Sequence, residues 1–233
     1  MNKKRTFALS DLHGEYNIWK QIKAFLKPED RVYFLGDAAD RGPDGWKLIK
    51  EFFNDSRIIY IKGNHEDMLA KAIREYYKYD EMIGKAGHLL FNNGGERTFT
   101  DWYTDGAYIE WANQLDKLPY YLTYENQQGI LIHLCHAGLT PWDSNPFMVD
   151  EHNCIWNREH YFEEPEIDEL NGISVHGHTP TPLLANDLRI KEVEEGAFWY
   201  CNDHKVDIDC GVFATGQTVL LDLDTFDEHI FSY

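Results

Sequence analysis

The stretch Phe7-Ala8-Leu9-Ser10-Asp11-Leu12-His13-Gly14 decides the fold, because a short apolar run ends directly in side chains that can bind a metal. The pattern returns at residues 32–42 (VYFLGDAADRG) and 58–66 (IIYIKGNHE). The aspartates that end the first two runs and the asparagine that ends the third are spaced by 26 and 27 residues, about one strand–helix–strand unit each. Parallel strands joined in this way place their carboxyl ends at one sheet edge, where ligands of open α/β sheets bind.

Helical periodicity fills the intervals between these strands. Residues 16–26 and 45–53 carry apolar side chains at helical spacing, and a third helix is expected to begin at or just after His65. Two further apolar runs, 130–132 and 173–175, are expected as strands.

Beyond His178 the pattern alternates, over residues 206–209 and 218–223. We expect these segments to be antiparallel strands of a second sheet behind the first.

The chain of 233 residues is expected to form one domain, 1–233, with an insertion at about 76–128 that is rich in aromatic residues. Helical hairpins packed on the domain are the simplest interpretation of this insertion. A cap that shapes the substrate site is the alternative.

Composition excludes several classes of protein. A formal net charge of −18 argues against general binding to nucleic acid or to anionic membranes, because both require a basic surface. No apolar run reaches the roughly 18–20 residues that cross a bilayer, and the apolar run after the basic start is too short for a signal peptide. We therefore expect a cytoplasmic protein whose four cysteines, without C-x-x-C spacing, are free thiols.

The polar residues after the strands form a set suited to two metal ions. Asp11 and His13 can reach one ion, and Asp37 is placed to bridge both. The second ion can be completed by residues that follow other strands: Asn64, His136 and His178. Imidazole, carboxylate and amide ligands together suit Mn²⁺, Zn²⁺ or Fe, and two such ions activate water against phosphate esters.

Four further residues are candidates for catalysis and phosphate binding. His65 begins a helix and is expected to point to the substrate, where Asp40 can hold its ring and raise its pKa. Such a pair can protonate a leaving group. Arg41 and Arg158 are the candidate phosphate clamps, because a guanidinium binds two phosphate oxygens in parallel.

The chain resembles the phosphoprotein phosphatase branch of the calcineurin-like metallophosphoesterases, and is most similar to the lambda-type protein phosphatases of bacteria and phages. The motifs Asp11-Leu12-His13-Gly14, Gly36-Asp37-x-x-Asp40-Arg41-Gly42 and Gly63-Asn64-His65-Glu66 carry the resemblance, together with His136-Ala137-Gly138 and Gly177-His178-Thr179. Additional similarity lies at Asn93-Gly94-Gly95, at residues 155–159 and at Asp209-Cys210-Gly211.

The resemblance implies a four-layer α/β fold, in which two mixed sheets pack together and are flanked by helices. It implies two divalent ions, with Mn²⁺ preferred and Zn²⁺ or Fe as alternatives. It places Asp11, His13 and Asp37 on the first ion and Asp37, Asn64, His136 and His178 on the second. His65 with Asp40 would be the acid pair, and Arg41, Arg158 and Asn64 would contact the phosphate. One departure is Lys62, which stands where family members usually carry arginine and loses the planar fork of a third clamp.

Three functions fit these residues. The preferred one is a metal-dependent phosphatase acting on phosphoserine or phosphothreonine, or on phosphotyrosine, in a phosphorylated protein or on a small phosphoester. The alternative is a symmetrical diadenosine tetraphosphate hydrolase, for which Phe198, Trp199 and Tyr200 could stack an adenine. The acidic charge of the chain favours the first. A non-catalytic metal-binding scaffold is the remote third interpretation.

Overall fold

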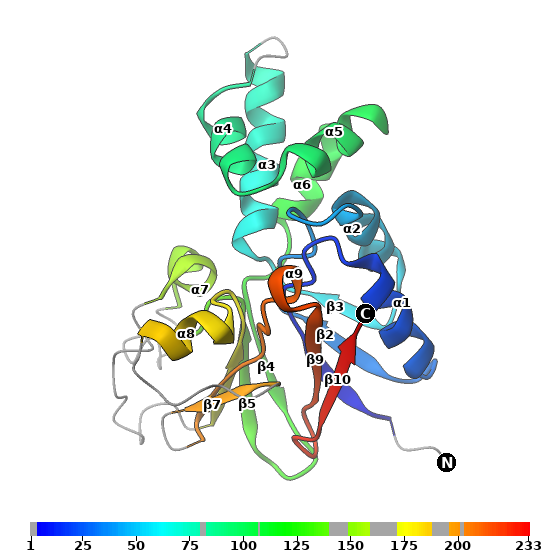
Figure 1. Ribbon diagram of the computed structural model, residues 1–233, viewed down its shortest axis with the longest axis vertical. Coiled ribbons are helices and arrows are strands. Elements are labelled where there is room, and N and C mark those ends of the chain that lie inside the picture. The colour runs from blue at the N-terminus through cyan, green and yellow to red at the C-terminus, as the bar shows by residue number, and fades with distance from the viewer. Residues whose placement is uncertain are drawn as a thin grey trace.

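Two five-stranded sheets lie against each other in the computed structural model, which describes residues 4–79, 83–106, 108–139, 149–158, 172–187, 196–200 and 203–233. Helices flank both sheets, and a group of helices rises above their shared upper edge (Figure 1). The helices are α1 Tyr16–Phe25, α2 Gly45–Asn54, α3 Asn64–Lys78, α4 Lys85–Asn92, α5 Glu96–Thr104, α6 Glu110–Asp116, α7 Glu151–Trp156, α8 Thr181–Asp187 and α9 Val212–Thr215. This arrangement is the expected fold class.

The first sheet has the order β10-β9-β1-β2-β3. Its strands are β1 Thr6–Leu9, β2 Arg31–Phe34, β3 Ile58–Tyr60, β9 Gln217–Asp222 and β10 Glu228–Ser232. β1, β2 and β3 are parallel, with Leu9 opposite Phe34 and Phe34 opposite Tyr60. All three strands therefore end at one edge, as their spacing predicted.

The second sheet has the order β4-β5-β6-β8-β7. Its strands are β4 Tyr121–Glu125, β5 Leu131–Cys135, β6 Ile173–His176, β7 Phe198–Tyr200 and β8 Lys205–Asp207. The expectation for the last strands was right in part. β8 belongs to the second sheet and is antiparallel to β7 as expected, but on its other side it runs parallel to β6, which the long connection between them permits. β9 is antiparallel as expected, but it pairs with β1 and belongs to the first sheet.

β1 and β9 in the middle of the first sheet are buried on both faces, which explains why their apolar residues do not alternate with exposed polar ones. Phe7 and Leu9 of β1 pack with α1 and α2 in one core, whereas Ala8 faces the second sheet in another. Val219 and Leu221 of β9 also belong to the core between the sheets. With both sides of the sheet fixed, the turns at its carboxyl edge rest on a rigid base.

The helices above the sheets continue the first core. Tyr76, Leu90, Phe99 and Trp102 are buried in the same cluster as the residues under β1. The segment 76–128 contains α4, α5, α6 and, at its end, β4, which pairs with β5 of the second sheet. These helices are thus packed elements with apolar contacts of their own.

No helix in the described part of the chain combines the length and apolarity that a bilayer crossing requires. Cys135, Cys154 and Cys210 are buried and are not joined in disulfides within the described part of the chain, while Cys201 lies outside the described residues.

Trp102→Ala should lower the free energy of unfolding by about 3–5 kcal/mol, because the side chain is fully buried against Tyr76 and Phe99 and leaves a cavity. Urea denaturation measures this change. Tyr103→Ala, which removes a half-exposed neighbouring ring, is the control and should cost far less. If both variants lost the same free energy of unfolding, the Trp102 side chain would not contribute more than a half-exposed ring, and the upper helices would not be part of the core.

Candidate active site

The turns that carry the site have an unusual backbone conformation. Of the eight described non-glycine residues with positive φ, six are candidate site residues: Asp11, His13, Asp37, Asp40, Arg41 and His178. Non-glycine residues seldom adopt such angles, and where they persist they cluster at functional sites. Backbone hydrogen bonds join the first two turns. The Asp11 amide donates to the Gly36 carbonyl and the His13 amide to the Asp37 carbonyl, both at 3.0 Å.

Four side chains that follow different strands converge at one point. His136 Nε2 lies 2.9 Å from Asn64 Oδ1 and 3.1 Å from His178 Nδ1, and it is 3.4 Å from Asp37 Oδ2. The Nδ1–H of His136 donates to the Leu35 carbonyl at 2.8 Å, which leaves Nε2 as the free ligand atom. The candidate residues of the second ion are therefore brought together.

The candidate residues of the first ion also meet at Asp37 Oδ2. His13 Nε2 lies 3.7 Å from Asp11 Oδ1 and 3.7 Å from Asp37 Oδ2. The Nδ1–H of His13 donates to the Ala39 carbonyl at 2.9 Å, so Nε2 again faces the acids. Asp11 Oδ1 is buried without a hydrogen-bond partner, as expected of an oxygen that serves a cation.

Two buried groups of ligand atoms result, His13–Asp37–His65 and Asp37–His136–His178, and they share Asp37. This donor set fits a binuclear site for divalent ions. The first group includes His65, which the sequence had assigned to the substrate; its Nε2 lies 3.7 Å from Asp37 Oδ2.

Burial dominates the electrostatics of the centre. Burial raises the pKa of Asp37 well above its usual range, and the neighbouring Asp11 and Glu66 raise it further. Burial also lowers the pKa of His13 and of His178 well below the ordinary value, so both imidazoles stay neutral. Neutral imidazoles and a deprotonated bridging carboxylate are the forms that bind metal.

His65 and Asp40 form the expected pair, with 2.7 Å between His65 Nδ1 and Asp40 Oδ2. The expectation that Asp40 raises the pKa of His65 was wrong. Burial and the Arg41 charge lower the pKa of His65, while burial raises the pKa of Asp40 to about 7. Desolvation of both partners outweighs their mutual attraction.

Both arginines lie at the candidate ligands. Arg41 Nη1 donates to His13 Nε2 at 2.8 Å, and its Nη2 lies 3.4 Å from His65 Nε2. Arg158 Nε donates to His178 Nε2 at 3.2 Å. The two guanidinium groups are therefore near both candidate ions.

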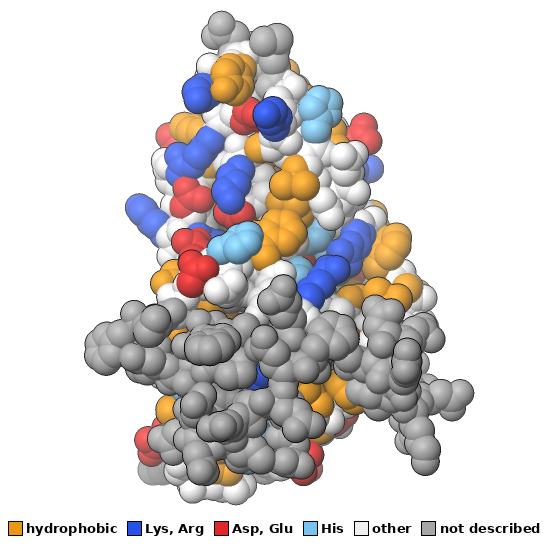
Figure 2. Space-filling view, turned by 90° about the vertical axis from the view of Figure 1, so that its left-hand side faces the viewer, with side chains coloured by type: hydrophobic (Ala, Val, Ile, Leu, Met, Phe, Trp, Pro, Cys, Tyr) orange, Lys and Arg blue, Asp and Glu red, His pale blue; other side chains and the backbone are white. Residues whose placement is uncertain are grey.

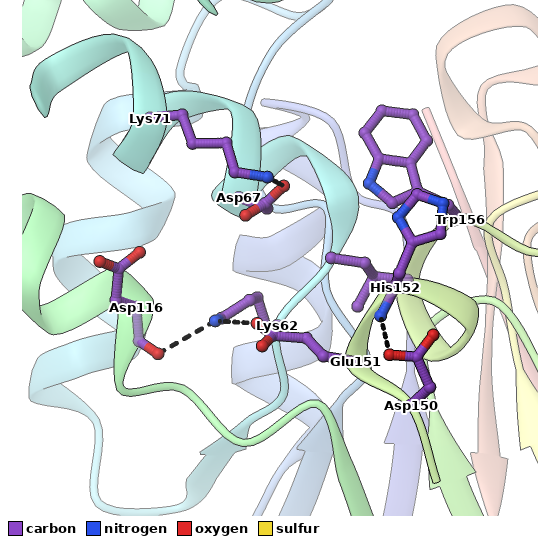
Figure 3. Close-up of a pocket in the computed structure, with 9 residues that line it drawn as sticks. Lys62, Asp67, Lys71, Asp116, Asp150, Glu151, His152 and Trp156 are labelled. Carbon is purple, nitrogen blue, oxygen red and sulfur yellow. Dashed lines mark hydrogen bonds and ion pairs between the residues drawn. The ribbon is translucent and has the colours of Figure 1, made fainter. Parts of the chain in front are cut away.

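Lys62 is engaged away from these groups, as Figure 3 shows. Its Nζ donates to Glu151 Oε1 at 2.6 Å and to the Asp116 carbonyl at 3.0 Å, and the side chain is 5% exposed. It lines a cavity of about 460 Å³ beside α7. The lysine thus connects the ends of β3 and α6 to the start of α7.

Phe198, Trp199 and Tyr200 form β7 at the edge of the second sheet. The Tyr200 hydroxyl shares a hydrogen bond of 2.7 Å with His176 Nε2, and Trp199 Nε1 donates to Glu228 Oε1 at 3.3 Å. None of the three lines the cavity that adjoins Arg41 and Arg158. The rings of Phe198 and Tyr200 stack on each other, and that of Trp199 packs edge-on against Phe226.

Glu66 is a positioning residue that the sequence analysis did not single out. Its Oε2 accepts the Asp37 amide at 2.8 Å and the Gly63 amide at 2.9 Å, and its Oε1 accepts the Ala38 amide and the Tyr60 hydroxyl. Gly63 is the N-cap of α3, and Glu66 lies three residues later, at the position of the glutamate in a capping box. This sequence signal could have identified Glu66.

The Asn93-Gly94-Gly95 motif supports the other turn. The Arg41 amide donates to the Gly94 carbonyl at 3.0 Å, and the Asp40 amide donates to Thr98 Oγ1 at 3.1 Å. A side chain at Gly95 would meet Leu90 and the Asp40 carboxyl group. The helices above the sheets therefore fix the Asp40–Arg41 turn.

Comparison with known proteins agrees with this geometry. A family model described as calcineurin-like phosphoesterase matches residues 4–208. The symmetrical bis(5'-nucleosyl)-tetraphosphatase of Buchnera aphidicola subsp. Acyrthosiphon pisum (strain 5A) is 27% identical over 145 residues, which are 60% of this chain and 47% of that protein. The chain spans about half the length of the curated relatives it matches.

Two solved structures share the fold. A protein provisionally described as a diadenosine tetraphosphatase has a TM-score of 0.66 at 13% identity, over 100% of this chain and 95% of that one. The cold-active protein-tyrosine phosphatase of a psychrophilic Shewanella species has a TM-score of 0.57 at 16% identity, over 97% and 77%. At these identities the likeness concerns the fold alone.

Glu66→Gln should weaken Mn²⁺ binding by about 10- to 100-fold, because an amide cannot accept all the backbone hydrogens that hold the Asp37 turn. Calorimetric titration of the metal-free protein with Mn²⁺ measures the affinity. Asp67→Asn, one residue along the same helix and paired with Lys71, is the matched control. Unchanged affinity in Glu66→Gln would remove its positioning role.

Proposed function

The chain belongs to the calcineurin-like phosphoesterase family, and we propose that it is a metal-dependent hydrolase of dinucleoside polyphosphates. The observation that supports hydrolysis is the pair of buried ligand groups that share Asp37. Two divalent ions bound there would supply an activated water and neutralise charge on the phosphate. Mn²⁺ is the ion that we propose.

The arginines are the proposed phosphate clamp. His13 Nε2 cannot offer its lone pair to a metal and to Arg41 at once, so Arg41 must release this contact in the loaded protein. His178, if it binds metal through Nδ1, carries its proton on Nε2, and Arg158 loses its acceptor in the same way. Both guanidinium groups are then available to phosphate oxygens.

His65 is the proposed proton donor to the leaving oxygen. Burial raises the pKa of Asp40 to about 7 and lowers that of His65, so the carboxyl group can keep a proton and donate it to Nδ1. The neutral ring then carries its own proton on Nε2, which faces the centre near Asp37, and Nδ1 takes the Asp40 proton as Nε2 gives its proton to the leaving oxygen. Donation from this nitrogen helps most when the leaving group is a strongly basic alkoxide, and less when it is a phosphate.

The curated relatives support the substrate class. Three of them, all from Buchnera aphidicola, are symmetrical bis(5'-nucleosyl)-tetraphosphatases, the class that the acidic net charge had placed second. That charge discriminates weakly, because at physiological ionic strength surface charges are screened over about 8 Å. Groups close to the phosphate, Arg41 and Arg158, matter more.

The first test is hydrolysis by metal-stripped protein, with and without added Mn²⁺, of diadenosine tetraphosphate and of a phosphoserine peptide at equal concentration. We expect Mn²⁺-dependent turnover with a higher kcat/KM for the dinucleotide. Asp37→Asn, which removes the shared bridging charge, should lose metal and turnover together. A higher kcat/KM for the phosphopeptide would overturn the substrate class and leave the metal site intact.

His65→Asn should reduce kcat by about 10²-fold or more on an alkyl phosphomonoester and much less on p-nitrophenyl phosphate, whose leaving group needs no proton. Metal content, measured by elemental analysis, should remain at two ions per chain. Loss of one ion would instead make His65 a ligand, as its place beside His13 and Asp37 allows. Equal losses on both substrates would remove the acid role.

A further inference from the structure

A cavity of about 340 Å³ opens directly beside the proposed phosphate clamp. Its lining combines Arg41, Arg158 and His178 with apolar residues that include Pro180, Leu183 and Phe213. Leu183 on α8 and Phe213 on α9 are 57% and 55% exposed. We refer to Leu183 and Phe213 as the apolar shelf. Figure 2 shows basic and hydrophobic side chains side by side at mid-height of one face of the molecule.

The two helices that carry the apolar shelf are fixed to each other through one residue. The Thr181 amide at the start of α8 donates to the Asp209 carbonyl, and the Gly211 amide before α9 donates to Asp209 Oδ1, both at 2.8 Å. Gly211 has a φ of 67° and lies against Pro180. The shelf is therefore held in place before any ligand binds, which reduces the entropy cost of binding.

Charge and polarity separate this cavity from the one beside α7. The cavity at Lys62 is lined by four carboxylates (Asp67, Asp116, Asp150 and Glu151), and its two lysines are already paired with Glu151 and Asp67. A polyanion would be repelled there. The cavity at the clamp offers two guanidinium groups and apolar walls, the combination that suits a group with phosphates at one end and a flat apolar surface at the other.

We propose that this cavity binds the nucleoside end of the substrate, with the apolar shelf contacting the base and with Arg41 and Arg158 holding the phosphates. The inference rests on the proposed function and assigns Leu183 and Phe213 as residues that determine specificity. A base stacked on an aromatic ring gains roughly tenfold or more in affinity. The volume lies within the range of about 300–1,000 Å³ that small-molecule sites occupy.

The experiment compares ligands that differ only in the nucleoside. Calorimetry on the Mn²⁺-loaded protein gives the affinities of adenosine diphosphate and of inorganic pyrophosphate. Steady-state kinetics give kcat/KM for diadenosine tetraphosphate and for inorganic tetraphosphate. Each ratio is measured in the wild type, in Leu183→Ala/Phe213→Ala, and in the control Leu89→Ala/Tyr103→Ala, whose side chains on α4 and α5 are 47% and 53% exposed.

We expect the wild type to bind adenosine diphosphate about tenfold or more tightly than pyrophosphate, and the shelf variant to lose about tenfold of that preference. In the shelf variant, the ratio of kcat/KM for diadenosine tetraphosphate to kcat/KM for inorganic tetraphosphate should fall, mainly because KM for the dinucleotide rises. The control variant should keep the wild-type values of both the binding ratio and the kinetic ratio. Unchanged ratios in the shelf variant would overturn the inference while hydrolysis of the dinucleotide upholds the proposed function.

The two proposals can fail separately. If the wild type does not hydrolyse diadenosine tetraphosphate, the proposed function falls, and the binding ratio still decides the inference. Equal affinities for adenosine diphosphate and pyrophosphate would then overturn it, and a preference that depends on the shelf would support it. If the shelf variant loses kcat/KM for a phosphopeptide and keeps kcat/KM for the dinucleotide, the cavity binds a peptide side chain and the nucleoside assignment is overturned.

Discussion

Negative charge buried at the junction of the two sheets is the constraint on which the rest of the structure depends. Asp11 and Asp37 are both at most 2% exposed, and the buried Glu66 lies beside them. Without a compensating cation, burial and mutual repulsion drive the pKa of Asp37 well above its usual range. Divalent ions reverse this balance, because they favour the charged carboxylate and use the neutral imidazoles around it. The centre is thus built for a cation before any substrate is considered.

Besides the buried charge, backbone strain at the site also costs free energy of folding. Six site residues hold positive φ angles, each worth of order 1–3 kcal/mol of strain. The hydrogen bonds between the Asp11 and Asp37 turns, the carboxylate of Glu66 and the contact of Gly94 with Arg41 hold these angles in place. Apolar packing on both faces of the first sheet makes those anchors rigid. Ions that bind only the folded chain would add stability by mass action.

The sequence predicted local features and the convergence of the candidate metal ligands, but it did not predict other long-range partners. Helical periodicity placed α1 and α2 within one residue of their observed ends, and the spacing of Asp11, Asp37 and Asn64 predicted one shared edge. Alternation in residues 218–223 indicated a strand but could not say which sheet it joins, because the pattern records burial and not the neighbour. The contact of Lys62 with Glu151 spans 89 positions, and the apolar shelf combines segments some 30 positions apart. Only the folded chain brings such pairs together.

Selectivity among phosphate compounds must come from the two sides of the centre, because the metal ligands and arginines would treat any phosphate alike. On one side, Lys62 is neutralised by Glu151 and surrounded by further carboxylates. On the other, Arg41 and Arg158 lead directly to Leu183 and Phe213. A polyphosphate extending from the proposed metal site would therefore meet repulsion in one direction and apolar contact in the other. Because the side chains of Leu183 and Phe213 are more than half exposed, substitutions at these two positions can change the apolar side without disturbing the turns that hold the ligands.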